Sequence, residues 1–139
     1  MTTSGILLDT HAWLWWSDRG DGWRPAVQTR LAAAVQQQNI YIASITLMEM
    51  ANMVRKQRVD LSMSLNAWFS MMKEKVSAQA LDLTTDIAVE IAQLPADFHG
   101  DPADRVIAAT ARVHGLTLCT HDRRLLQYGK QGLFSTLEI

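Results

Sequence analysis

Four acidic residues stand where short apolar runs give way to helical patterns. Asp9 follows the run "ILL", and Glu49 lies inside the segment after "IYIAS". Asp104 and Asp122 come before and after the run "LTLCT". Two carboxylates about 4 Å apart repel by about 4 kcal/mol at an effective dielectric of about 20, and a hard divalent cation such as Mg²⁺, which prefers oxygen ligands, offsets this cost. If the four acids converge, they predict metal-assisted attack of water on a phosphate.

Most of these acids also have an explanation that needs no chemistry. Asp9 and Asp122 stand where helix N-caps are expected, and acids are favoured at any helix start by its free N–H groups and its dipole. That second argument applies equally to Asp101 and Asp104. Glu49 is harder to explain, because its segment is apolar nearly all round. The polar residues of that segment form one narrow stripe, which must face water or a site: Thr46, Glu49, Asn52 and Lys56.

The elements that must position these residues alternate along the chain. Runs rich in β-branched and aliphatic residues predict strands at 5–10, 40–44, 78–83, 116–120 and 134–139. Helical patterns predict helices around 11–18 and over 24–37, 44–57, 62–76, 84–94, 101–115 and 122–129. Ser44 is the expected N-cap of its helix. This alternation predicts the α/β class, with a mostly parallel sheet between two helical layers and ligands beyond the carboxyl ends of the strands.

Composition limits the type of protein. The 139 residues suit a single domain over 1–139, and 48% hydrophobic residues indicate an ordinary globular core. The net charge of −1 excludes an overall basic field that would attract nucleic acid, although a local patch fits within that total. Cys119, the single cysteine, is expected to be buried and reduced. We therefore expect a cytoplasmic protein.

Three segments of the chain resemble the PIN domain, specifically the VapC-type toxins of bacterial toxin–antitoxin pairs. They read "LLDTHAWLWW", "SITLMEMANMV" and "HGDPADRVIAATARVHGLTLCTHDRRLL". The resemblance runs through nearly the whole chain, and residues 58–80 match only as a generic helix. It implies a PIN-like three-layer α/β/α fold and a Mg²⁺-dependent endoribonuclease toxin, with Mn²⁺ as an alternative ion.

The resemblance also assigns roles to residues. Thr10 and Thr120 are candidates to hold a carboxylate or a metal-bound water. Asp101 matches a supporting acid of members with this D-P-x-D-R form. RNA would be cleaved by a metal-activated water, so the family's acids are at once the catalytic and the metal-ligating candidates: Asp9, Glu49, Asp104 and Asp122.

Contacts with substrate and partners are expected on two further sets of residues. Arg105, Arg123 and Arg124 are candidates for binding RNA phosphates, with Arg112 and Arg58 among the other basic residues considered. By resemblance, an antitoxin segment lies in an apolar groove and the toxin forms a homodimer. Exposed aromatic surface would mark that groove, and its candidates are Trp13, Trp16 and Trp68, with Trp68 and Met72 expected on an exposed helix face.

Other functions stay open on the residues alone. The chain could be a catalytically inactive PIN-like binding module, or a metal-dependent nuclease for another nucleic acid. A receiver-type or haloacid-type phosphotransfer domain also places an Asp after its first strand. Such sites need a suitably placed Lys, and the haloacid type also needs an acid at position 11. This chain has His at position 11, and no Lys follows a late strand. His11 and His121 also invite a zinc site, although zinc prefers His and Cys together and the single Cys is expected to be buried.

Overall fold

Five strands form one parallel sheet in the computed structural model, which describes residues 4–98 and 101–139. His99 and Gly100 of the motif quoted above therefore lie outside the described residues. The strands stand in the order β3-β2-β1-β4-β5, and each neighbouring pair is parallel. The expected α/β class with a parallel sheet is confirmed. The strands are β1 (Ile6–Leu8), β2 (Ile40–Ala43), β3 (Gln79–Leu81), β4 (Thr117–Thr120) and β5 (Thr136–Glu138).

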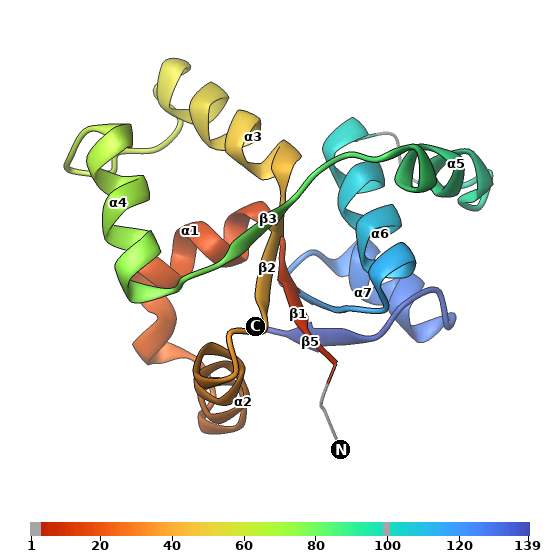
Figure 1. Ribbon diagram of the computed structural model, residues 1–139, viewed down its shortest axis with the longest axis horizontal. Helices are drawn as coiled ribbons and strands as arrows, with labels where there is room; N and C mark the ends of the chain where they lie inside the picture. The colour runs from red at the N-terminus through yellow and green to blue at the C-terminus, as the bar shows by residue number, and fades with distance from the viewer. Residues whose placement is uncertain (1–3, 99–100) are drawn as a thin grey trace.

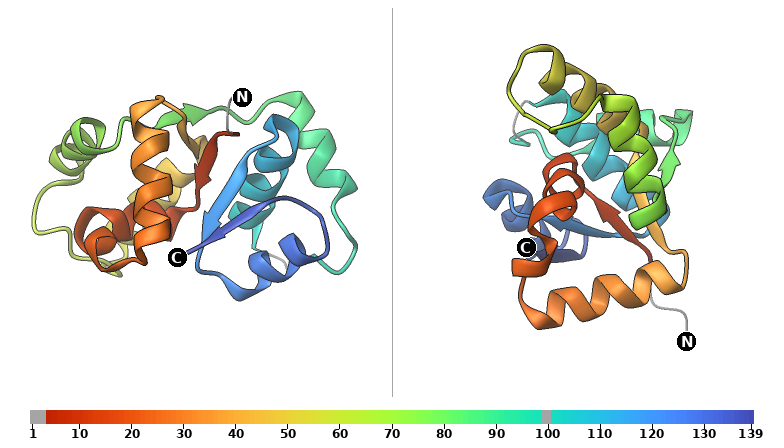
Figure 2. Two further views of the ribbon diagram at one scale, coloured as in Figure 1. Left: turned by 90° about the horizontal axis from the view of Figure 1, so that it is seen from below. Right: turned by 90° about the vertical axis from the view of Figure 1, so that its left-hand side faces the viewer.

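Helices cover both faces of this sheet. In Figures 1 and 2, α1, α2 and α4 lie on one side and α5, α6 and α7 on the other, while α3 stands at the end of β2. In the described part of the chain, no helix has the length and apolar character needed to cross a membrane. The helices are α1 (Thr10–Arg19), α2 (Pro25–Gln36), α3 (Ser44–Arg55), α4 (Leu65–Lys75), α5 (Thr85–Gln93), α6 (Pro102–His114) and α7 (Arg123–Lys130), with a short 3₁₀ turn at Gly20–Gly22.

The central strand β1 is buried on both faces. Ile6 and Leu8 pack into the cluster formed with α1, α2 and α4, whereas Leu7 packs into the cluster formed with α6 and α7. Successive side chains of a strand point to opposite faces, so a continuous apolar run is required where helices cover both. Cys119 is buried in the first of these clusters, as expected from its apolar surroundings.

The sheet has a topological switch point between β1 and β4. After β1 the chain continues outward through β2 to β3, and it then returns to place β4 on the other side of β1. The connections that leave β1 and β4 therefore pack on opposite faces, which opens a crevice beyond the carboxyl ends of these two strands. Figure 1 shows β1 between the two helical layers.

Two helix starts differ from those expected. Ser44 is the first residue of α3, and the preceding Ala43 takes the N-cap position without a side-chain hydrogen bond. Helix α4 begins at Leu65 instead of residue 62, because Ser64 is its cap and accepts the Ala67 N–H at 3.1 Å. Ser62 has a φ of 60° and donates its N–H to the Asp60 carboxylate at 2.9 Å, a turn that cannot continue into a helix.

The aromatic residues of α1 and α4 are more buried than expected. Trp13 and Trp68 meet edge to face at 4.9 Å between ring centres and are 5% and 1% exposed. The prediction that Trp68 and Met72 lie on an exposed face is wrong, because α4 turns both side chains into the cluster beneath it. Trp16 is half-buried and packs against Trp23.

Candidate active site at the carboxyl edge of the sheet

The predicted acids line one cavity of about 290 Å³ at the switch point. Asp9 stands between β1 and α1, and Asp122 stands between β4 and α7. Glu49 comes from α3, while Asp101 and Asp104 come from the start of α6. Segments far apart in the sequence thus bring five carboxyl groups together. The cavity is lined by Asp9, Thr10, His11, Trp15, Glu49, Asp101, Asp104, His121 and Asp122.

Three of these acids also cap helices. Asp9 accepts the Ala12 N–H at 2.7 Å, at the start of α1. Asp101 caps α6 and Asp122 caps α7, each through its Oδ1 atom. These three acids therefore serve as helix caps and line the acidic cavity at the same time. Three helix N-termini point at the cavity, and their dipoles favour negative charge there.

Two threonines hold the acids that reach furthest into the protein. The Thr120 hydroxyl donates to Asp9 Oδ2 and accepts the Asp122 N–H at 3.0 Å, so it links the ends of β1 and β4. The Thr10 hydroxyl donates to Glu49 Oε1 and lies 3.0 Å from the hydroxyl of the buried Thr46. The positions of both carboxylates are thereby fixed by groups on neighbouring elements.

The cavity disfavours ionised carboxyl groups in the absence of a cation. Burial raises the pKa of Asp9 and is also the main cause that raises the pKa of Glu49. For Asp104, burial and then the charges of Asp101, Asp122, Glu49 and Asp9 raise the pKa from 3.8 to about 7. Burial and like charges both penalise the ionised form, and a bound cation would reverse the second effect.

The carboxyl oxygens of the cavity suit a hard cation that keeps part of its water shell. They do not suit an ion that is surrounded by protein ligands alone. Over residues 4–98 and 101–139, no three His, Cys, Asp or Glu side chains form a ready-made metal cluster. Mg²⁺ keeps several waters and takes only one or two carboxylates, so an acid-lined cavity of this size suits it. Zinc fits poorly, because Cys119 is fully buried and burial raises the pKa of its thiol.

The basic residues predicted to bind RNA lie outside the lining of this cavity. Arg105, Arg123 and Arg124 are exposed on the neighbouring helices α6 and α7. Arg112 is held by an ion pair with Glu90 and by a hydrogen bond to the Leu133 carbonyl oxygen at 2.6 Å. It therefore fixes α6 against its neighbours and is not free to bind phosphate.

Sequence reasoning missed Trp15 as a residue of the cavity. Its indole lies 5.5 Å from the His11 ring and 5.5 Å from the His121 ring, between ring centres. His121 is oriented in turn by a hydrogen bond of 2.8 Å from Nδ1–H to the Ile139 main-chain oxygen. The spacing in "WLWW" does separate Trp15 from Trp13 and Trp16, but nothing in the sequence indicates which face meets the acids.

Comparisons with known proteins agree with this geometry. The family model of the PIN domain matches residues 6–131. Ribonuclease VapC22 of Mycobacterium tuberculosis is 36% identical over 130 residues, which cover 90% of this chain and 91% of that protein. The phosphotransfer domains considered above belong to other families, so the match removes their support.

Solved structures share the fold. The DNA-bound VapBC of Salmonella typhimurium matches with a TM-score of 0.67 and 20% identity, over 98% of each chain. VapBC2 of Rickettsia felis, bound to a promoter DNA fragment, matches with a TM-score of 0.72 and 15% identity, over 96% of this chain and 98% of that one. With the acids gathered at the switch point and the sequence matched over nearly its whole length, the chain belongs to the PIN domain family, among the VapC ribonucleases.

Proposed function

We propose that this chain is a single-domain, metal-dependent endoribonuclease that uses Mg²⁺, with Mn²⁺ as a substitute. The observation that carries the proposal is the convergence of five carboxyl groups on one cavity, where burial and then the charges of the neighbouring acids raise the pKa of Asp104 to about 7. A bound divalent cation would offset this repulsion, and helix capping accounts for only three of the five acids. The relationship to Ribonuclease VapC22 supports RNA as the substrate.

Each residue of the cavity has a distinct part in this proposal. A bound Mg²⁺ supplies a Lewis acid that lowers the pKa of water and stabilises charge on the phosphate. Thr120 and Thr10 keep Asp9 and Glu49 in place through the hydrogen bonds described above. Asp101 adds negative charge at the rim, and exposed arginines on α6 and α7 contact phosphates further along the RNA. The residues that would hold the ion are Asp9, Glu49, Asp104 and Asp122.

RNA cleavage with and without a chelator tests the proposal. Wild-type protein should cleave single-stranded RNA in Mg²⁺, lose activity in EDTA and regain it when Mg²⁺ or Mn²⁺ is added. Asp104→Asn should lower the rate by at least about 100-fold, because groups that merely orient metal ligands already contribute about 10- to 100-fold. Asp86→Asn is a matched control, since this acid lies in the first turn of α5 and outside the cavity.

Three results would contradict the proposal in different ways. Absence of cleavage by well-folded wild-type protein on any RNA would favour an inactive binding module. Cleavage confined to DNA in the same assay would favour a nuclease for another nucleic acid. Cleavage that persists in EDTA would remove the metal from the proposal.

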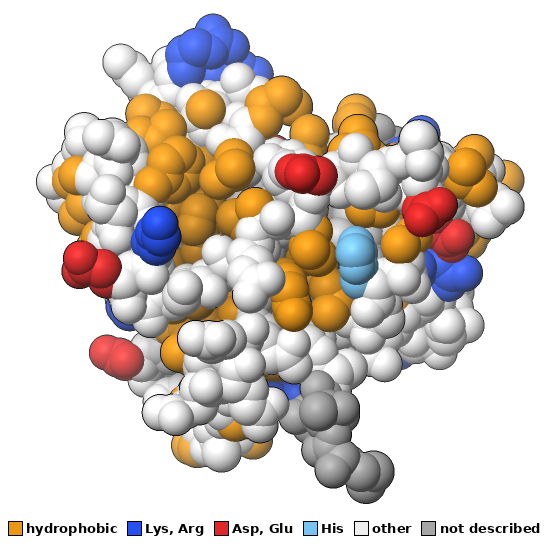
Figure 3. All heavy atoms as spheres, in the orientation of Figure 1, with side chains coloured by type: hydrophobic (Ala, Val, Ile, Leu, Met, Phe, Trp, Pro, Cys, Tyr) orange, Lys and Arg blue, Asp and Glu red, His pale blue; other side chains and the backbone are white. Residues whose placement is uncertain are grey.

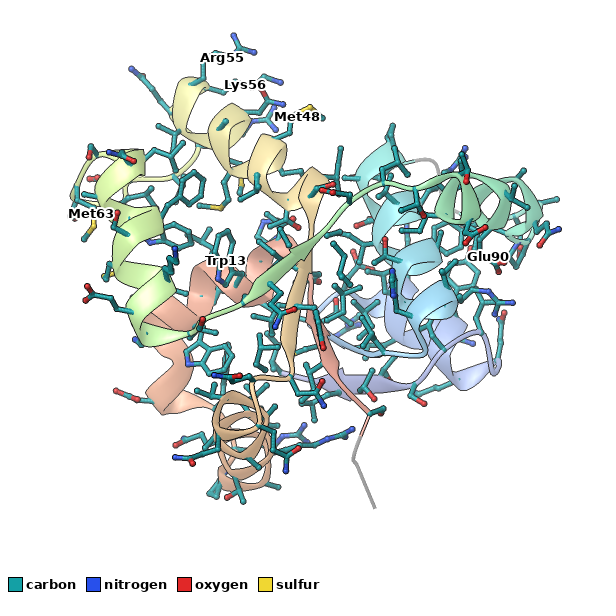
Figure 4. The ribbon with its side chains drawn as sticks, in the orientation of Figure 1. Trp13, Met48, Arg55, Lys56, Met63 and Glu90 are labelled. Carbon is teal, nitrogen blue, oxygen red and sulfur yellow. The ribbon has the colours of Figure 1, made fainter. Side chains whose placement is uncertain are left out.

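We also propose that an antitoxin binds an apolar groove on this chain. A second cavity, of about 480 Å³, lies between α1, α3, α4 and β3. Its walls include Trp13, Leu47 and Phe69, and Lys73 lies at its side. Figure 3 shows hydrophobic side chains gathered on this face, and Figure 4 shows Trp13 behind them, with Arg55 and Lys56 at the far end of α3. This surface suits an amphipathic segment with apolar and acidic residues.

We propose that this chain forms a homodimer. We also propose that it acts in the cytoplasm, where its RNA substrate and its protein partner are found. Leu83, just before α5, and Val89, within α5, are 54% and 56% exposed and offer apolar surface outside the lining of the acidic cavity. Light scattering should therefore give about twice the chain mass of 15.6 kDa. A monomeric mass at micromolar concentration would contradict the dimer.

A further inference from the structure

Trp15 borders two cavities. It lines the acidic cavity of about 290 Å³, and it also lines a neighbouring cavity of about 520 Å³ under the loop between α3 and α4. His11 is the other residue that both cavities share. The indole therefore separates the place where a phosphate would be cleaved from a second hollow directly beside it.

The neighbouring cavity has mixed walls. Leu14, Met53 and Met71 give it apolar surface. Polar and charged groups also line it: Ser17, Asp18, Arg58, Asp60 and Ser62. A nucleobase has the same two kinds of surface, because its faces are apolar and its edges carry hydrogen-bond donors and acceptors. Arg58 lies in this lining beside the carboxyl groups of Asp18 and Asp60, so the cavity as a whole is not basic and charge alone would not hold an RNA strand there.

The orientation of the indole is fixed by its neighbours. The His11 and His121 rings meet Trp15 at interplanar angles of 57° and 68°, so both stand steeply against the indole and neither lies flat on it. The two imidazoles are steeply inclined to the Trp15 indole and contact it without stacking on it. The indole is thus a stacking surface whose position is set before substrate binds. Bound bases stack on aromatic side chains in this way in many proteins that take single-stranded RNA.

We propose that the cavity beside Trp15 receives the nucleobase next to the cleaved phosphate, and that this base stacks on the Trp15 indole. The inference rests on the proposed ribonuclease function and adds a residue that selects substrate. It also explains how a polyanion is held at a rim of carboxyl groups: stacking attracts the base without needing positive charge. The apolar groove at Leu47 and Phe69 lies elsewhere, so a protein partner does not need this hollow.

The test uses a single-stranded oligoribonucleotide whose cleavage position is first mapped with wild-type protein. Versions of it then carry an abasic site on one or the other side of that position. Trp15→Ala should lower kcat/KM by about 5- to 100-fold, mainly through KM, and Trp15→Phe should recover most of the loss. An abasic site on one side should lower wild-type cleavage by a similar factor and have no further effect on Trp15→Ala. Trp16→Ala is the matched control, because this adjacent tryptophan lies outside the lining of both cavities.

The outcomes separate this inference from the function on which it rests. If wild-type protein cleaves RNA in Mg²⁺ but the abasic sites affect wild type and Trp15→Ala equally, the stacking role is wrong and the nuclease stands. Equal losses in Trp15→Ala and Trp16→Ala would also overturn it, as a general effect of removing a tryptophan. If Trp15→Ala cleaves normally and only binds a protein partner less tightly, the hollow belongs to that partner. A wild-type protein that cleaves no RNA would overturn both proposals.

Discussion

Asp9 shows why the choice of substitution matters at this site. One of its carboxylate oxygens caps α1 and the other accepts a hydrogen bond from the Thr120 hydroxyl. The residue therefore both stabilises the local structure and supplies negative charge to the cavity. Replacement by Ala removes the cap as well as the charge, and caps of this kind contribute about 1 kcal/mol to stability. Asn keeps an oxygen for the cap, removes the charge and reverses the Thr120 contact, because its amide N–H₂ donates where the carboxylate accepted. Lost activity in an Asn variant that melts like wild type can therefore be assigned to the missing carboxylate and not to the missing cap.

Asp104 gives a prediction on pH and stability. Its raised pKa of about 7, against an ordinary 3.8, means that the folded chain keeps a proton that the unfolded chain releases between these two values. The free energy of unfolding of the metal-free protein should therefore fall as pH rises from about 4 to about 7. The slope should stay well below the ceiling of about 1.4 kcal/mol per pH unit for one proton, because Asp104 is only partly buried.

Thermal melts in EDTA at several pH values between 5 and 8 measure this effect. The melting temperature of wild type relative to Asp104→Asn should decline from pH 5 to about 7 and level off above it, and added Mg²⁺ should remove the decline by favouring the ionised carboxylates. Asp86→Asn serves again as the control and should follow wild type. A difference between wild type and Asp104→Asn that is flat with pH would show that Asp104 ionises at its ordinary pKa.

At the scale of elements, much of the fold could be predicted because its signals are local. The run "ILL" is apolar throughout and "TLCT" is buried throughout, with Leu118 and Cys119 apolar between two threonines, as a strand covered on both faces requires. Helix α6 follows its sequence punctuation closely: Asp101 caps it, Pro102 opens it and Gly115 ends it with a φ of 63°. Each of these residues specifies its own backbone conformation without help from the rest of the molecule.

The remainder depends on packing that local patterns do not encode. The narrow polar stripe of α3 did indicate that Glu49 faces a site, but the helix is less buried than expected, since Met48 is 55% exposed. All three tryptophans of α1 are suited to a core, and only the position of α4 and β4 decides that Trp13 is buried and Trp15 faces the acids. The convergence of the acids likewise depends on the strand order, which contacts between distant segments set.

The arrangement of the whole molecule separates the groove at Leu47 from the acidic cavity. Leu47 lines this groove and is 38% exposed, so Leu47→Asp should leave the fold intact and weaken binding of the antitoxin that we propose for this chain. The expected loss is about 10-fold or more in Kd, which calorimetry measures, because a charge would enter the apolar centre of the interface. RNA cleavage by the free variant should be unchanged.

Val113→Asp controls for the introduced charge. Val113 is also 38% exposed, but it belongs to α6, on the opposite side of the sheet. Antitoxin affinity should be the same in this variant as in wild type. Equal affinity in Leu47→Asp would mean that the antitoxin docks on another surface.

The bond between Thr120 and Asp9 spans 111 positions of the chain. A polypeptide emerging from the ribosome carries Asp9 and Glu49 long before Asp104 and Asp122 have been made, and it cannot pair β4 with β1 until then. A partly synthesised copy therefore lacks part of the acid set that we propose to hold the metal. Under that proposal, RNA cleavage begins only once translation of the chain is nearly finished.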